Sequence, residues 1–188
     1  ELGNLMIKVG ELNNTRTIAL IDEIEQPIGH CFCNALELAE SLQCLNGNFP
    51  ADLKDLVFTQ AAELMCAAHP QESRENILTR CHEAVTSGAA LDKFKALLMK
   101  QGVDSELAET ICQPGQFTVD DYLKMFKQEA NFRTDILAPD SGYVKSQDAG
   151  LIGKVAWQLG GGRRTPESKI DYTVGVRLLK KIGDFVTK

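Results

Sequence analysis

Apolar residues recur three or four positions apart along much of the chain, which is the pattern of helices that bury one face. The pattern predicts a first helix over residues 2–9, stopped by the next glycine, and a second over residues 27–46. Between them, residues 17–21 form a nearly unbroken apolar run with the length of a covered strand. This order predicts an α/β unit, in which ligands gather beyond the end of the strand, here at residues 22–29.

Five more helices are predicted in the middle of the chain, where apolar stripes are separated by proline, glycine and capping residues. Pro50 opens the first of them, and Asp104 or Ser105 caps the fourth. Thr118 and Asp121 have the spacing of a capping box at the start of the fifth. We expect these stripes to pack into a core rather than to bind a cofactor.

Glycines become frequent after residue 138, and short β-like pieces alternate with them at residues 142–144, 154–157 and 172–176. This change predicts a boundary near residue 137. We therefore expect an α/β (α+β) fold, with a helix-rich first unit over residues 1–137 and a small β-rich unit over residues 138–188.

The composition of the chain argues against several classes of function. The chain has 26 acidic and 20 basic residues, for a net charge of −6, which argues against binding to nucleic acids or anionic membranes, since these require a positive surface. No apolar run reaches the roughly 18 residues of a membrane span, and no signal peptide is visible. The six cysteines lack zinc-ligand spacing, so we expect free thiols in a reducing compartment, the cytosol.

The common catalytic motifs of hydrolases, nucleotide-binding loops and zinc proteases are missing from these residues. Two local features remain. Gly160-Gly161-Gly162-Arg163-Arg164 suits contact with an anion, although a flexible hairpin with solvated arginines explains it equally well. Glu37 and Glu40 lie one helical turn apart, which a solvated helix face also explains.

More specific motifs lie around the predicted strand and in the tail. Residues 19–29 read Ala-Leu-Ile-Asp-Glu-Ile-Glu-Gln-Pro-Ile-Gly, and residues 34–38 read Asn-Ala-Leu-Glu-Leu. The tail carries Ser141-Gly142-Tyr143-Val144, Leu159-Gly160-Gly161-Gly162-Arg163-Arg164, Ile170-Asp171-Tyr172-Thr173-Val174-Gly175 and Lys181-Ile182-Gly183-Asp184. In this order, the motifs resemble the thymidine/pyrimidine-nucleoside phosphorylase family over nearly the whole chain.

The resemblance implies a particular architecture and reaction. Family members have a helical domain, a mixed-sheet α/β domain and a β-rich C-terminal domain, and they work in the cytoplasm as homodimers. Phosphate, the co-substrate, attacks the sugar of a pyrimidine nucleoside and releases the base, with no organic cofactor. The family's Lys-x-Ser segment and Ser-Gly-Arg-Gly loop precede the matched region. We therefore expect residues 1–188 to be the second half of the α/β domain plus most of the tail, to hold no catalytic residue and to be inactive alone.

Two sites carry over to this chain from the resemblance. A potassium-like cation would be held by the backbone carbonyls of Ile28 and Cys31 and by the carboxylate of Glu40. Gly161, Gly162, Arg163 and Arg164 would belong to a mobile flap, residues 160–168, that orders over phosphate and substrate. Cys33 stands where the family commonly has glycine, and Ile24 where it commonly has methionine.

Two alternatives remain open at this stage. Residues 137–144 and 179–186 also resemble the halves of a biotinyl/lipoyl-type carrier barrel, but no lysine lies in the hairpin context that such a carrier modifies. The other alternative is a noncatalytic structural or interaction module. The choice among thymidine, uridine and deoxyuridine depends on base-reading residues that precede the matched region.

Overall fold

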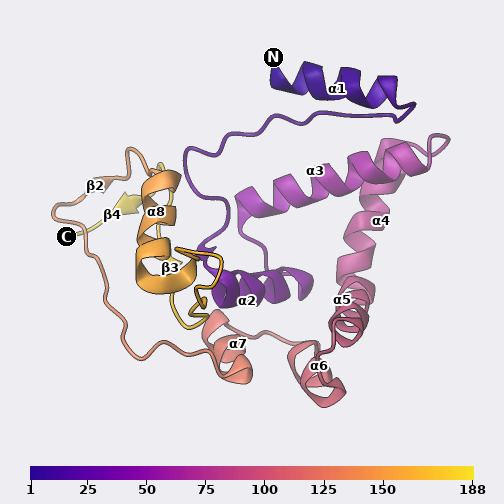
Figure 1. Ribbon diagram of the computed structural model, residues 1–188. Helices are drawn as coiled ribbons and strands as arrows, with labels where there is room; N and C mark the ends of the chain where they lie inside the picture. Colours follow the sequence, from indigo (N-terminus) through magenta and orange to yellow (C-terminus); the bar gives the residue numbers. More distant parts are fainter.

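Helices make up most of the regular structure in the computed structural model, which describes residues 1–188 (Figure 1). The helices are α1 (Leu2–Leu12), α2 (Asn34–Leu45), α3 (Ala51–Ala68), α4 (Arg74–Thr86), α5 (Ala89–Lys100), α6 (Ser105–Ile111), α7 (Val119–Phe126) and α8 (Ala149–Ala156), which runs into a π-helical turn, Trp157–Gly161. The strands are β1 (Cys31–Phe32), β2 (Gly142–Tyr143), β3 (Val176–Arg177) and β4 (Phe185–Val186). No helix combines the length and the apolar composition that a bilayer span requires.

The five helices predicted in the middle of the chain are present as α3 to α7, and their start signals work as expected. Asp104 caps α6, because its carboxylate accepts hydrogen bonds from the N–H groups of Glu106 and Leu107. Thr118 and Asp121 form the complete capping box at the start of α7.

Two separate cores hold these helices together. The larger lies among α2, α5, α6 and α7, where Leu42 and Tyr122 are fully buried. The smaller lies between the paired helices α3 and α4, around Phe58 and Ile77. The expectation that the apolar stripes build a core is confirmed for these faces.

The predicted strand at residues 17–21 is wrong. This segment runs back along α1, with the N–H of Thr15 bonded to the carbonyl of Gly10 at 2.9 Å, and residues 16–24 form no backbone hydrogen bonds (Figure 1). A strand requires a neighbouring chain to complete its ladder, and no other segment lies beside this one as a strand. As a result Ile21 is 93% exposed. The first helix also continues to Leu12, past the expected stop at Gly10.

The second helix begins at Asn34, seven residues after the predicted start at Pro27. Gly29 and Cys33 have φ angles of 72° and 86°, which no right-handed helix contains. Residues 31 and 32 instead pair as β1 with β3 in an antiparallel ladder, Cys31 opposite Arg177. The predicted end at Asn46-Gly47 is confirmed.

The tail carries three of the four strands, so a helix-rich body followed by strands is the observed order. Its sheets are small: β2 pairs with β4, and β3 pairs with β1 of the first unit. The β-like reading of residues 154–157 is wrong, because they continue α8 into the π-helical turn. Asp148 caps this helix by accepting a hydrogen bond from the N–H of Leu151 at 2.9 Å.

Candidate functional site

The carboxylate of Glu40 lies against the loop that precedes β1. Glu40 projects from the buried side of α2 and is only 6% exposed, so the solvated-face reading of this residue is wrong. Its Oε1 atom accepts a hydrogen bond of 2.8 Å from the N–H of His30. Gly29 passes so close that a Cβ there would collide with Glu40 Oε2, and its φ of 72° is also one that glycine adopts readily.

Of the two carbonyls predicted as cation ligands, that of Ile28 lies in this loop and that of Cys31 belongs to the first residue of β1. The N–H of Leu178 donates to the carbonyl of His30 at 2.7 Å, so His30 occupies a hydrogen-bonded position in the β1–β3 ladder. Alternate residues of an antiparallel pair face opposite ways, so the Cys31 carbonyl points away from β3. No protein donor reaches the carbonyl of Ile28. The structure thus places Glu40 against the segment that contains Ile28 and Cys31.

A second carboxylate holds the loop from its other side. Asp52, at the start of α3, accepts hydrogen bonds from the N–H of Gly29 at 3.1 Å and from Lys181 Nζ at 2.9 Å. Partial burial by itself would raise the pKa of Asp52, but the hydrogen bonds from Lys181 and from backbone N–H groups outweigh it and hold the pKa below its usual range. Sequence reasoning missed this pair, because its members lie 129 positions apart.

The thiols beside Glu40 are held in their neutral form. Burial, together with the nearby Glu40 carboxylate, raises the pKa of Cys31 to about 12. Burial and the same carboxylate raise the pKa of Cys44 to about 12. All six cysteines are free, as predicted, and these two cannot supply thiolate ligands near neutral pH.

A small hollow of about 240 Å³ opens beside Glu40. Polar side chains contribute to its lining, among them those of Gln43, Asn48 and Arg177. Arg177 also pairs with Asp120 of α7 at 3.2 Å, so a residue of the tail forms one wall of the hollow. Glu40 itself forms part of the lining of this hollow.

The predicted flap lies against the start of α2. A Cβ on Gly161 would lie 2.5 Å from Cys33 Sγ, so glycine permits the close approach of these two segments. The Arg163 carbonyl accepts a hydrogen bond from Trp157 Nε1 at 3.1 Å, and the Arg164 guanidinium lies 5.2 Å from the centre of the Trp157 ring. Both arginines of the flap therefore contact Trp157, which lies just before the flap in the sequence.

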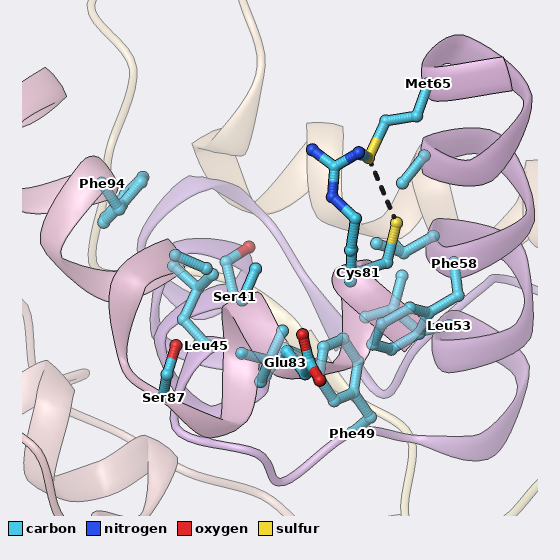
Figure 2. A pocket seen from close by; sticks show the side chains of 17 residues that line it. Ser41, Leu45, Phe49, Leu53, Phe58, Met65, Cys81, Glu83, Ser87 and Phe94 are labelled. Atoms are coloured by element: carbon cyan, nitrogen blue, oxygen red, sulfur yellow. Dashed lines mark hydrogen bonds between the residues drawn. The ribbon is translucent and has the colours of Figure 1, made fainter. Parts of the chain in front are cut away.

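A larger groove of about 770 Å³ separates the two cores (Figure 2). Thirteen of its 17 lining residues are hydrophobic, and they come from α2, α3, α4, α5 and the α2–α3 connection. Figure 2 shows the Cys81 thiol and Met65 sulfur in contact on one wall, 3.5 Å apart. None of the residues predicted for the cation or the phosphate lines this groove. Helical periodicity did not reveal it, since a groove-lining face has the same pattern as a buried one.

Comparison with known proteins first identifies the class of the tail. Residues 143–188 match the family described as "Pyrimidine nucleoside phosphorylase C-terminal domain".

Whole-length similarity then extends the assignment. A pyrimidine-nucleoside phosphorylase of Bacillus subtilis (strain 168) is 35% identical over 188 residues, which cover 100% of this chain and 40% of that protein. A pyrimidine-nucleoside phosphorylase of Staphylococcus aureus (strain USA300) is 37% identical over 185 residues, 98% of this chain and 40% of that protein. The chain thus spans about two fifths of the length of these relatives. It corresponds to the C-terminal portion of the pyrimidine-nucleoside phosphorylase family, which confirms the resemblance and does not favour the carrier or noncatalytic alternatives.

Proposed function

We propose that residues 1–188 form the C-terminal part of an enzyme that transfers the pentose of a pyrimidine nucleoside to phosphate. A phosphate oxygen would attack the anomeric carbon, the carbon–nitrogen bond would break, and the products would be a free base and a (deoxy)ribose 1-phosphate. The observation that carries this proposal is the match of essentially the whole chain to two enzymes named pyrimidine-nucleoside phosphorylase.

In this proposal the chain supplies scaffold, and the groups that react with the substrate lie in a preceding part of the enzyme. Two features support an incomplete surface at the start of the chain. Leu5, Met6 and Val9 of α1 are each more than half exposed on one face of the helix. Residues 16–24 also leave their backbone groups without backbone partners. A further part of the enzyme would cover both.

We further propose that Glu40 and the carbonyls of Ile28 and Cys31 hold a potassium-like cation. The donor set fits, because a hard cation prefers oxygen ligands and these three groups lie in one loop and the helix behind it. The carboxylate is buried and forms no ion pair with a lysine or arginine, so a bound cation would compensate its charge. The cation would supply a fixed positive charge beside the family's Lys-x-Ser segment, which would lie in the preceding part of the enzyme.

The flap, residues 160–168, would order over phosphate when the domains close. Arg163 and Arg164 would then pair with phosphate oxygens, and Arg164 would leave the face of Trp157 to do so. The complete enzyme is proposed to be a cytoplasmic homodimer, and the six free cysteines suit a reducing compartment.

Reconstitution tests the activity. A polypeptide of residues 1–188 is purified and mixed with the N-terminal three fifths of the Bacillus subtilis relative, and base release from thymidine or uridine with phosphate is followed by absorbance. We expect no release from either piece alone and measurable release from the mixture. Release by residues 1–188 alone would refute the assignment of the reacting groups to a preceding part. A mixture that associates but stays inactive would count against the proposed reaction.

Thermal unfolding in different salts tests the cation site. At equal ionic strength, the melting temperature should be higher in potassium chloride than in tetramethylammonium chloride, and the difference should grow as the site fills. At a potassium concentration of 100 times the dissociation constant, the added free energy of unfolding should be about 2.7 kcal/mol. Glu40→Gln should abolish the difference. Glu37→Gln, one turn away on an exposed part of the same helix, is the matched control and should retain it.

A further inference from the structure

Lys181 joins the tail to the loop that precedes β1, across 154 positions of sequence. Its ammonium group donates to the carbonyl of Pro27 and to Asp52 Oδ2, the second at 2.9 Å. The side chain is only 14% exposed, so both contacts lie largely out of water. Two neighbouring contacts reinforce the junction: the N–H of Ile182 donates to Gln26 Oε1 at 3.0 Å, and that of Leu178 donates to the carbonyl of His30.

The Lys181–Asp52 pair controls the peptide groups on both sides of Ile28. On one side, the carbonyl of Pro27 is held by Lys181 Nζ. On the other, the N–H of Gly29 is held by the same Asp52 oxygen that Lys181 contacts. Every peptide bond in the chain is trans, and in a trans peptide the C=O and the N–H point in opposite directions. Because the Gly29 N–H points at Asp52, the carbonyl of Ile28 must point away from it.

The next peptide group is held by the other carboxylate. The N–H of His30 donates to Glu40 Oε1, so residues 27–30 are suspended between Asp52 on one side and Glu40 on the other. Of these two acids, Asp52 has a cationic partner within the chain and Glu40 has none. Lys181 therefore supplies the positive charge that compensates Asp52, the carboxylate on one side of the loop.

We propose that Lys181 is a positioning residue. Acting through Asp52 and Pro27, it sets the direction of the Ile28 carbonyl and holds the loop in position against Glu40. The proposal deepens, and for its functional meaning rests on, the proposed cation site. It makes that site a joint product of α2, α3 and the tail. A residue of the tail would thus position the loop at residue 28, although the two lie far apart in the sequence.

Amide hydrogen exchange by NMR on ¹⁵N-labelled residues 1–188 tests the proposal without any cation. In Lys181→Met, the amides of Gly29 and His30 should exchange at least about tenfold faster than in the unmodified chain, since a charge-assisted contact is lost. The amides of α4 and α7 should be unchanged. Lys181→Arg should restore most of the protection, because its guanidinium can still donate to both acceptors.

Lys180→Met is the matched control. Lys180 lies beside Lys181, but its Nζ donates to the carbonyl of Phe185 within the tail. Its replacement should leave Gly29 and His30 protected. If Lys181→Met does not fold, Asp52→Asn takes its place, since it removes the charge of the partner and should raise the same two exchange rates.

Unchanged exchange at Gly29 and His30 in the folded variant would overturn the proposal. So would faster exchange spread evenly over the chain without rescue by Lys181→Arg, because that result describes a general loss of stability. A melting-temperature comparison in potassium and tetramethylammonium salts separates the two proposals. If potassium stabilises neither the unmodified chain nor any variant, the cation site fails, while the exchange rates still decide the role of Lys181.

Discussion

Replacing Gly29 with alanine probes the contact between the loop and Glu40 directly, because the added methyl group would collide with Glu40 Oε2. The substitution has two costs. An alanine at a φ of 72° costs about 1–2 kcal/mol relative to glycine. Displacing Glu40 also breaks the hydrogen bond that it accepts from the N–H of His30. A hydrogen bond to a charged group contributes about 1.5–3 kcal/mol to stability.

The free energy of unfolding should therefore fall by roughly 2.5–5 kcal/mol in Gly29→Ala. Gly47→Ala isolates the backbone contribution. Gly47 has a φ of 91°, and a Cβ there would meet no atom within 4 Å, so its replacement should cost only about 1–2 kcal/mol. The difference between the two variants measures the collision with Glu40.

Urea denaturation followed by circular dichroism gives the free energies by linear extrapolation. A double-mutant cycle completes the test: in a Glu40→Ala background, where nothing is left to collide with, Gly29→Ala should cost no more than Gly47→Ala. Equal costs for Gly29→Ala and Gly47→Ala in the chain that retains Glu40 would refute the close approach of the loop to this carboxylate.

Three further predictions follow from burial and charge. Leu42→Ala should lower the free energy of unfolding by about 2–5 kcal/mol, because Leu42 is fully buried, whereas Leu151→Ala, at a position 61% exposed, should change it by about 0.5 kcal/mol or less; equal losses would contradict the core assignment. Cys31 and Cys44, each with a pKa raised to about 12, should react with iodoacetamide near pH 8 far more slowly in the folded chain than in urea, as read by peptide mass mapping; equal rates would contradict their burial. Because the pKa of Asp52 is lowered on folding, its contribution to stability should be complete above the ordinary carboxyl pKa of about 4 and should be lost as the pH falls through the lowered value. The difference in free energy of unfolding between the unmodified chain and Asp52→Asn should therefore shrink on acidification, and a constant difference would contradict the pair with Lys181.

Local signals in the sequence identified most of the helices correctly. The ends of α2 and α5 and the starts of α3, α6 and α7 lie at residues whose own chemistry begins or stops a helix. Such signals act over three or four residues, so they work without knowledge of the rest of the chain. The tail shows their limit: glycines suggested strands around residues 154–157, but the cap at Asp148 and the apolar spacing that follows it produce α8.

The proposed cation ligands came from a resemblance in short motifs, and the structure places Glu40 against the segment that contains Ile28 and Cys31. The motifs did not reveal the residues that hold this loop in place. Periodicity predicted a helix from Pro27, and the loop observed there is held by Asp52, Leu178 and Lys181. Charge partners that lie more than a hundred residues apart leave no periodic pattern in a sequence.

By itself, the sequence determined the helical body, the capping residues, the free thiols and the resemblance to a family. Only the tertiary structure decided three other features: the loop at residues 27–30, the pairing of β1 with the tail, and the unpaired state of residues 17–21. The physical reason is the range of the interactions. A helix completes its hydrogen bonds within four residues, whereas a strand or an irregular loop depends on partners that the fold alone brings beside it.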